Sequence, residues 1–331
     1  MAVNRYYSGP RSDHFDGRLF FNPGQDRPGQ GRKGHSLRDV WHWKRTAKPA
    51  KWPRHVPLAP AVPEARVEGI RITMVGHASV LVQVAGLNIL TDPVWSKRAS
   101  PFRFIGPRRV TPPGIAFNAL PPIHAVLISH NHYDHLDITT LKRLQAAHAP
   151  LIVAPLGNDT IIRKAVPDAH VQTRDWGESV DIGHGATVTL TPANHWSARG
   201  LRDRRMALWA GFWLHTPKGQ IGFAGDTGYG DGTLFRDLRA RYGAPDIALI
   251  PIGAYEPRSF MATQHVNPME AVRIFSDIGA RDALGIHWGT FQLTDEARTA
   301  PCADLHAALL AAGIAPARFV PAEPGGVYDF G

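Results

Sequence analysis

A short segment that reads as a buried strand, followed at once by a dense group of histidines and aspartates, most restricts the fold of this chain. Residues 125–129 form the strand, and residues 130–137 read His-Asn-His-Tyr-Asp-His-Leu-Asp. Side chains two positions apart in an extended segment share one face, so His130 and His132 can bind the same cation. The following turn directs a carboxylate and a third imidazole toward a second cation. Because zinc favours this mixture of ligands, the sequence predicts a hydrolytic metal centre.

Polar residues follow predicted strands at several other points of the chain. Asp92, Asp226 and His287 each come directly or almost directly after an apolar segment, and His195 lies just beyond the predicted strand 186–191. Proteins with alternating helices and strands gather their active-site groups at strand ends. We therefore expect these side chains to meet the histidine cluster and to complete two coordination shells.

Strands alternate with helices and hairpins along the chain, which predicts an α/β fold of sheets flanked by helices. We expect regular structure to begin at Ile70, and Asp137 and Asn267 each to cap a helix. The long proline-rich loop 93–122 carries several basic residues, and loops of this length are usually functional or disordered. The expected strands are 70–75, 79–85, 87–91, 125–129, 151–154, 186–191, 207–216, 220–224, 246–252 and 283–286, and the expected helices are 137–147, 157–165, 232–241, 268–278 and 302–312.

The composition restricts the compartment and the class of protein. Cys302 is the only cysteine in 331 residues, so no intramolecular disulfide can form, which fits a reducing compartment. The first residues lack the apolar core of a signal peptide, and the longest apolar runs are too short to span a bilayer. We expect a cytoplasmic protein, soluble or peripheral on the inner face of the membrane.

The net charge of +9 is concentrated near the N-terminus. Residues 1–66 hold 13 Lys and Arg against 5 Asp and Glu, whereas residues 67–331 hold 24 against 23. Trp41, Trp43 and Trp52 lie among these basic residues, a mixture that suits an anionic membrane surface or a nucleic-acid backbone. The alternative is an arm whose tryptophans cover the catalytic domain. We divide the chain into a basic extension, 1–66, and a catalytic domain, 67–331.

Several segments resemble the metallo-β-lactamase-fold superfamily, and within it the group of N-acyl-phosphatidylethanolamine phospholipase D and its bacterial RomA-like relatives. The resemblance covers residues 70–331, with a weaker echo at residues 17–22. The segments that carry it are 74–79, 91–96, 99–101, 106–109, 129–137, 225–229, 251–255, 264–268 and 286–291.

The resemblance implies a four-layer αββα sandwich and two zinc ions, with manganese or iron as alternatives. It places His130, His132 and His195 on the first ion, and Asp134, His135 and His287 on the second. Asp226 would bridge both, and His265 would be a catalytic residue near the substrate. For His265, a surface residue that precedes a helix is an equal alternative. Asp92 would orient the histidine cluster from behind, a role we extend to His77 and Asp137.

The implied reaction is hydrolysis by a metal-bridging hydroxide, most simply a phosphodiesterase reaction on phospholipid-like substrates, with Asp134 and Asp226 as catalytic carboxylates. Aspartate at position 226 argues against a true β-lactamase, for which the resemblance implies cysteine. Side chains assigned to substrate binding are Arg199, Tyr229, Tyr255, Gln264 and Trp288. For the aromatic residues, packing in the core is an equal alternative.

Three other functions stay open at this point. A lactone, ester or thioester hydrolase would use the same dinuclear site with a different pocket. Nucleic-acid binding through the basic arm is disfavoured, because the catalytic part is nearly neutral and carries no recognised RNA-binding motif. A metal-binding scaffold without activity is disfavoured by the full set of ligands. The expected partner is a small-molecule substrate, and a homodimer is compatible with the sequence.

Overall fold

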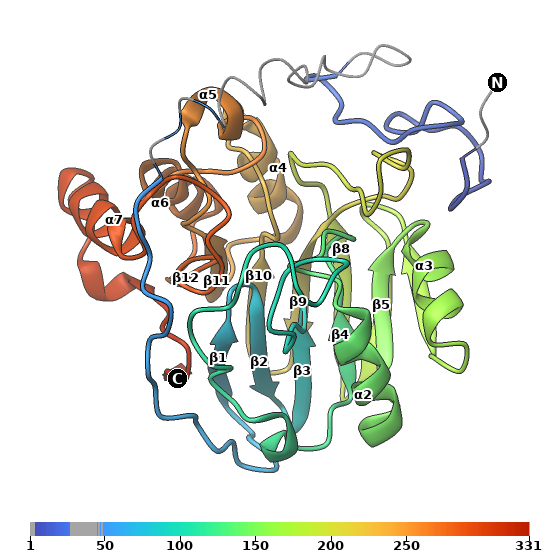
Figure 1. Ribbon diagram of the computed structural model, residues 1–331, viewed down its shortest axis with the longest axis horizontal. Coiled ribbons are helices and arrows are strands. Elements are labelled where there is room, and N and C mark those ends of the chain that lie inside the picture. The colour runs from blue at the N-terminus through green and yellow to red at the C-terminus, as the bar shows by residue number, and fades with distance from the viewer. Residues whose placement is uncertain (1–3, 27–44, 46, 48, 331) are drawn as a thin grey trace.

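Two sheets of seven strands each form the centre of the fold (Figure 1). The computed structural model describes residues 4–26, 45, 47 and 49–330. The first sheet has the order β14-β1-β2-β3-β4-β5-β6, and the second has the order β13-β12-β11-β10-β9-β8-β7. The strands of the first sheet are β1 (Ile70–Gly76), β2 (Ser79–Val84), β3 (Leu87–Thr91), β4 (Ala125–Leu127), β5 (Leu151–Pro155), β6 (Val171–Arg174) and β14 (Val327–Phe330). Those of the second are β7 (Ser179–Gly183), β8 (Ala186–Thr191), β9 (Gly211–Thr216), β10 (Gly219–Phe223), β11 (Ile247–Pro251), β12 (Asp282–Ile286) and β13 (Phe319–Pro321).

The two sheets have the same plan, an antiparallel part that continues into a parallel part. Strands β3 to β6 are parallel, as are strands β10 to β13. Parallel strands need crossover connections, and here helices make several of them. The carboxyl ends of parallel strands meet at one edge, so residues that follow β3, β4, β10 and β12 come together there.

Apolar side chains fill the space between the sheets and the space under the helices. The inner core joins the two sheets through residues such as Val82, Leu127, Val188 and Phe212. A second apolar cluster lies between the first sheet and helices α2 (Ile138–His148) and α3 (Asn158–Ala165). A third lies between the second sheet and helices α4 (Thr233–Tyr242), α6 (Pro268–Ile278) and α7 (Ala300–Ala311). The predicted four-layer αββα sandwich is confirmed.

Two helix starts follow the predicted capping. The Asp137 carboxylate accepts a hydrogen bond from the Thr139 backbone N–H and caps α2. Asn267 caps α6 in a reciprocal arrangement with Glu270. Such caps stabilise a helix end by about 1 kcal/mol, because they satisfy backbone N–H groups that the helix leaves unpaired.

The sequence missed four strands (β6, β7, β13, β14), the short helix α5 (Arg258–Met261) and two 3-10 turns, η1 (Phe117–Ala119) and η2 (Pro316–Arg318). Strands β7 and β14 lie at sheet edges and alternate exposed with partly or fully buried residues. They lack the apolar runs by which the buried strands were recognised. The predicted strand 207–216 begins only at Gly211, because Ala207–Ala210 lead away from the sheet to Ser129 and Leu156.

The N-terminal segment 4–26 lies against the domain, at the top of Figure 1. Phe15 and Phe20 are buried with Leu208 and Trp209, and the two phenyl rings are 4.6 Å apart. Residues 49–66 also make contacts, since Trp52 Nε1 donates to the Glu296 carbonyl. Residues 4–26 and 49–66 therefore cover parts of the catalytic domain, as the alternative interpretation of the N-terminal extension expected. Trp41, Trp43 and most of the basic stretch around them lie outside the described residues.

Among the described residues, no helix combines the length and apolar character needed to cross a membrane.

Candidate metal centre

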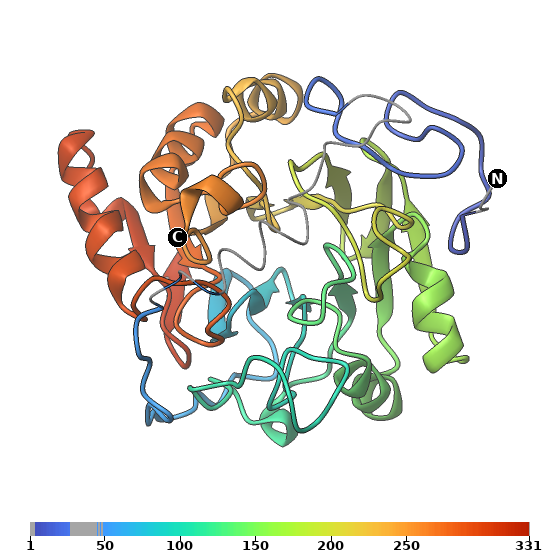
Figure 2. The same cartoon turned by 45° about the horizontal axis from the view of Figure 1, so that its top comes forward.

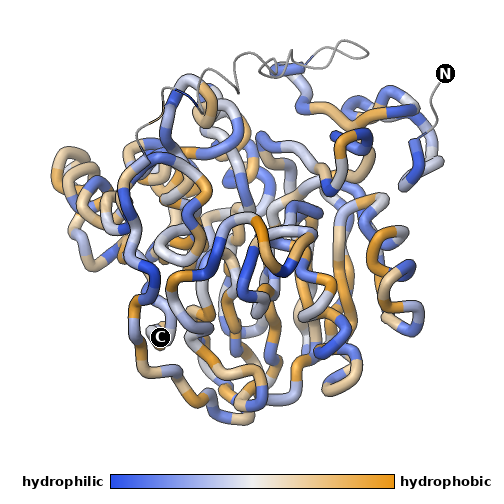
Figure 3. Tube along the Cα trace, in the orientation of Figure 1, coloured by the Kyte–Doolittle hydropathy of each residue, from blue (hydrophilic) through white to orange (hydrophobic). Residues whose placement is uncertain are grey.

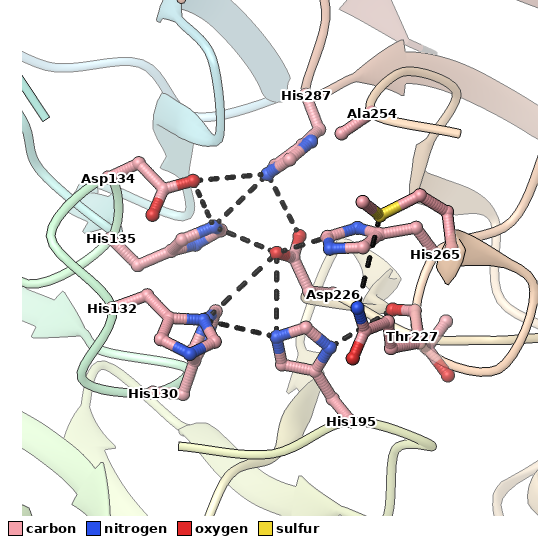
Figure 4. A network of polar contacts seen from close by, with 12 residues as sticks. His130, His132, Asp134, His135, His195, Asp226, Thr227, Ala254, His265 and His287 are labelled. Carbon is pink, nitrogen blue, oxygen red and sulfur yellow. Dashed lines mark hydrogen bonds and ion pairs between the residues drawn. The ribbon is translucent and has the colours of Figure 1, made fainter. Parts of the chain in front are cut away.

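Seven predicted ligands converge at the edge where the parallel strands end (Figure 4). The turn after β4 supplies four of them, and single residues after β8, β10 and β12 supply the others. All are buried or half-buried. The residues that the structure brings together are His130, His132, Asp134, His135, His195, Asp226 and His287.

Three imidazoles form the first group. His132 Nδ1 lies 2.8 Å from His130 Nε2 and 3.3 Å from His195 Nε2. Burial lowers the pKa of His130 and His195 well below the usual value, helped in each case by a neighbouring histidine. Burial also lowers the pKa of His132 to about 4. At neutral pH these three rings are therefore uncharged, and their lone pairs are free to bind one cation.

The second group joins two imidazoles with a carboxylate. His135 Nε2 and His287 Nε2 are 3.2 Å apart. Asp134 Oδ2 lies 3.4 Å from the first of these atoms and 3.5 Å from the second. His77 Nε2 lies 2.9 Å from the same oxygen, within hydrogen-bonding distance of Asp134.

Asp226 lies between the two groups. Its Oδ2 is 3.1 Å from His135 Nε2 and 3.8 Å from His195 Nε2, and its Oδ1 is 3.2 Å from His287 Nε2. Burial alone would raise the pKa of Asp226, but His135 and His287 hold it well below the usual value. An ionised carboxylate therefore faces both groups, which is the position required of a bridging ligand.

The donor set fits two divalent cations. Ligand atoms around a tetrahedral zinc ion, at about 2.0–2.1 Å from the metal, are roughly 3.3 Å apart, and the donor atoms here are separated by 2.8 to 3.5 Å within each group. Burial lowers the pKa of His135, but Asp226 and Asp134 more than offset this and raise it well above the usual value. A cation competes with that proton for the same lone pair.

Asp92 orients the turn that carries four of the ligands. Its Oδ2 accepts hydrogen bonds from His135 Nδ1 at 2.7 Å and from Ser129 Oγ at 2.6 Å, and its Oδ1 accepts from the Ser129 N–H. With Nδ1 protonated, the lone pair of His135 lies on Nε2 and faces the cluster. These are the contacts that an orienting residue would make, and the role of Asp92 stays a prediction. Asp137 acts one step further away, as the cap of α2 and the acceptor for Ser96 N–H.

The loop of His195 is held by contacts that the sequence did not predict, although Gln264 itself was assigned to substrate binding. His195 Nδ1 donates to the Gln264 carbonyl at 3.0 Å, and the His195 carbonyl accepts from Asn22 Nδ2 at 3.0 Å. Asp26 accepts from the Asn22 N–H and forms a buried ion pair with Arg205 at 3.0 Å. The weak family echo at residues 17–22 was the one signal that pointed to this segment.

His265 joins the cluster from the start of α6. Its Nδ1 lies 3.9 Å from Asp226 Oδ2, and its ring centroid is 5.1 Å from that of His195. Burial lowers the pKa of His265 to about 4. The side chain retains 13% exposure, whereas His130, His135, His195 and His287 retain 1% or less. Of the ligand histidines, only His132 is also half-buried.

The five predicted substrate-binding residues lie in different surroundings. Arg199 borders a cavity next to the turn of the ligands and stacks on Tyr133. Gln264 supports His195 and accepts from Trp196. The contacts of the other three lead away from the cluster: Tyr229 donates to Asp277, Tyr255 donates to Asp304, and Trp288 packs in the outer core. The contacts of these three residues are therefore those expected of packing, the alternative to substrate binding.

Two cavities lie beside the ligand loops. One, of about 660 Å³, is bordered by Tyr133, Leu136 and Arg199 and by the loop from Ser96 to Arg103. The other, of about 970 Å³, lies on the side of the N-terminal segment and is bordered by Asn22, Asn194 and Thr263. The seven predicted ligands line neither cavity, but residues next to them in the sequence do, Tyr133 and Leu136 in the first and Asn194 in the second.

Comparison with known proteins agrees with this architecture. The model of the beta-lactamase superfamily domain matches residues 87–288. N-acyl-phosphatidylethanolamine-hydrolyzing phospholipase D 1 of Caenorhabditis elegans is 40% identical over 233 residues, which are 68% of this chain and 65% of that protein. The chain thus spans slightly less than two thirds of the length of the worm protein.

Two further similarities concern proteins described as metal-dependent or metallo hydrolases. A UPF0173 metal-dependent hydrolase of Pyrobaculum neutrophilum is 31% identical over 227 residues, which are 68% of this chain and 86% of that protein. The structure of a metallo hydrolase from Ignicoccus hospitalis has a TM-score of 0.58 at 18% identity, covering 79% of this chain and 98% of that chain. At this identity the structural likeness concerns the fold.

Proposed function

This chain belongs to the beta-lactamase superfamily domain family of metal-dependent hydrolases, and from that membership we propose that it is a dinuclear zinc phosphodiesterase acting on phospholipid-like substrates. The observation that carries the proposal is the position of Asp226. Its two carboxylate oxygens face the His135–His287 pair at 3.1 and 3.2 Å, and one of them lies 3.8 Å from His195 of the other group. One carboxylate between two ligand groups is the arrangement that a pair of cations requires.

The chemistry expected of this site is hydrolysis without a side-chain nucleophile. When bound, two divalent cations lower the pKa of water and offset the negative charge of the transition state. The two ligand groups would hold those cations, and Asp92 and Gln264 hydrogen bond to the rings of His135 and His195 that would bind them. His265 keeps partial exposure beside Asp226, where its ring can hydrogen bond to a substrate oxygen.

The phosphodiester class is favoured over other electrophiles by two observations. The worm relative is by name a phospholipase D that hydrolyses N-acyl-phosphatidylethanolamine. Beside the ligand turn, the 660 Å³ cavity is bordered by basic side chains, including Lys97, Arg103 and Arg199. Guanidinium groups are well suited to phosphate oxygens. Water would add to phosphorus, the bond to the head-group oxygen would break, and the head group would leave as an alcohol beside a phosphatidate.

A panel of substrates on zinc-loaded protein tests the proposal. We expect N-acyl-phosphatidylethanolamine in mixed micelles to yield an N-acylethanolamine and phosphatidate, both identified by mass spectrometry. A soluble aryl phosphodiester should also be hydrolysed, more slowly. Lactones and thioesters serve as the parallel arm, because the same metals can attack a carbonyl carbon. Turnover of lactones or thioesters that exceeds every phosphodiester tested would contradict the assignment.

A further inference from the structure

Two loops beside the metal centre expose apolar side chains at their tips. We call residues 97–108 and 199–204 the rim loops. Phe102, Phe104 and Ile105 in the first are 54%, 79% and 58% exposed, and Leu201 in the second is fully exposed. The described residues leave eight large apolar side chains exposed, and these four are half of them. Exposed apolar side chains gathered at one place mark a surface that contacts something apolar.

The first rim loop is built as a stiff projection. Two hydrogen bonds close its base, from the Ala99 N–H to the Pro107 carbonyl and from the Arg109 N–H to the Lys97 carbonyl. The rings of Phe102 and Phe104 contact each other at 5.7 Å across the tip. The apolar tip is therefore held away from the core by its own backbone contacts. Figure 3 shows apolar and hydrophilic stretches alternating on the loop that crosses the front of the molecule.

The second rim loop is attached to the metal centre. Arg199 Nη1 donates to the carbonyls of Asn131 and Leu136, which belong to the ligand turn. The buried carboxylate of Asp203 accepts from the Arg199 and Gly200 N–H groups and from the Tyr6 hydroxyl. These bonds hold the backbone that presents Leu201 to solvent.

The charge around the apolar tips is almost entirely positive. The rim loops carry seven basic residues and one acidic residue, Asp203, whose carboxylate is buried. Most of these cations are exposed, although residues 67–331 are nearly neutral as a whole. The basic residues are Lys97, Arg98, Arg103, Arg108, Arg199, Arg202 and Arg204. Apolar tips surrounded by cations are complementary to an anionic lipid surface, where acyl chains lie beneath charged head groups.

The rim loops also lie where such a surface would serve the reaction. Phe102 and Arg103 from one loop and Arg199 from the other border the same 660 Å³ cavity, together with Tyr133 and Leu136 of the ligand turn. In Figure 2, turned so that the metal-centre edge comes forward, loops of both sheets surround this edge. A lipid head group at the rim would therefore be one cavity away from the ligands.

We propose that the rim loops dock the protein on an anionic bilayer, with Phe102, Phe104, Ile105 and Leu201 inserted among the lipids and the surrounding cations at the head groups. The inference rests on the proposed function for the lipid nature of the substrate. It places the membrane contact on the catalytic domain rather than on the basic N-terminal extension. Ile105 and Leu201 favour a bilayer over nucleic acid, because aliphatic side chains cannot stack on bases as aromatic rings do.

Vesicle flotation of the zinc-loaded full chain tests this inference. The variants are F104S/I105S/L201S, which removes three tips outside the cavity, and R103Q/R202Q, which removes two cations. L310S is the matched control, because Leu310 on α7 is 59% exposed and lies outside the rim loops. Vesicles contain phosphatidylcholine with or without phosphatidylglycerol. Melting temperature and metal content show that each variant is folded.

We expect the wild type and L310S to bind vesicles only when phosphatidylglycerol is present. Each fully buried apolar side chain contributes roughly tenfold to the partition coefficient, so the triple variant should lose up to about a thousandfold. The R103Q/R202Q variant should bind more weakly, and added salt should reduce wild-type binding. Binding unchanged in the triple variant, or binding independent of phosphatidylglycerol, would overturn the inference, as would oligonucleotide binding without vesicle binding.

Failure of this inference and failure of the proposed function give different results. Hydrolysis of a soluble phosphodiester without vesicle binding would leave the function standing and remove the docking surface. Vesicle binding that depends on the rim loops, without hydrolysis of any phosphodiester, would leave the docking surface standing and remove the function.

Discussion

The ligand turn 130–135 and the loop of His195 hold ligands of one cluster by different means. The ligand turn is fixed by close neighbours at adjacent strand ends, since Asp92 and Ser129 follow β3 and β4 of one sheet. His195 is fixed by residues from distant parts of the chain, among them Asn22 and Gln264. The metal site can therefore be recognised from the ligand turn alone, although some of the residues that hold its ligands lie far away in the sequence.

Removal of Asp92 is expected to disturb the ligand turn 130–135 most strongly. In Asp92→Ala the His135 ring loses the acceptor at Nδ1, and the Ser129 hydroxyl loses one partner and keeps His130. Such orienting carboxylates contribute about 10–100-fold to metal affinity or activity. We expect a loss near the upper end of that range, measured as kcat/KM on a soluble phosphodiester and as zinc affinity. Asp181→Ala, an exposed position in the edge strand β7, is the control. Wild-type zinc affinity in Asp92→Ala would refute the role.

Removing Asn22 tests whether the distant support matters as much. Asn22→Ala deletes the bond to the His195 carbonyl and one to Trp209. We expect about a tenfold fall in kcat/KM, the lower end of the range for orienting residues, because Gln264 still holds the His195 ring. Added zinc should recover part of the activity. Arg18→Ala, an exposed change in the same segment, should leave it unchanged. Equal values of kcat/KM in Asn22→Ala and Arg18→Ala would show that Asn22 has no positioning role.

The smallest expected effect concerns how pH changes the docking of the N-terminal segment. Burial lowers the pKa of His14, but hydrogen bonds to Asp175 and Asp13 more than offset this, so the pKa is raised above its usual value of 6.5. The stabilisation is fully present below pH 6.5 and is lost as the pH rises through the raised value. Amide hydrogen exchange in residues 4–26, corrected for its intrinsic pH dependence, should speed up over that window. His14→Gln should remove this dependence, and an unchanged profile in the variant would contradict the assignment.

The contrast between the two regions also explains what the sequence could predict. Residues 130–137, Asp226 and His287 were identified because each follows an apolar strand and carries a metal-ligand side chain. Asp137 and Asn267 were identified as caps because capping depends on residues nearby in sequence. Asn22, Asp26 and Arg205 could not be found in this way, because their pairing depends on tertiary contacts across more than 150 residues. Edge strands such as β7 were missed because their exposed faces carry no apolar run.

The same reasoning accounts for the substrate contacts. Aromatic residues beside ligands, such as Trp288 and Tyr229, have the composition of a pocket wall and of a core equally. Only the structure separates these alternatives, by pairing Tyr229 with Asp277 and placing Trp288 under α7 and α6. The exposed tips of the rim loops had no distinguishing pattern in the sequence, because an apolar residue in a loop is as often buried as exposed.

The most direct test of the account is the metal content of zinc-reconstituted protein after removal of excess metal, for the wild type and for Asp226→Ala. Because Asp226 faces both ligand groups, the account predicts two zinc ions per wild-type chain, at least one fewer in the variant, and nearly abolished hydrolysis. A variant that retains both ions and wild-type turnover would contradict it.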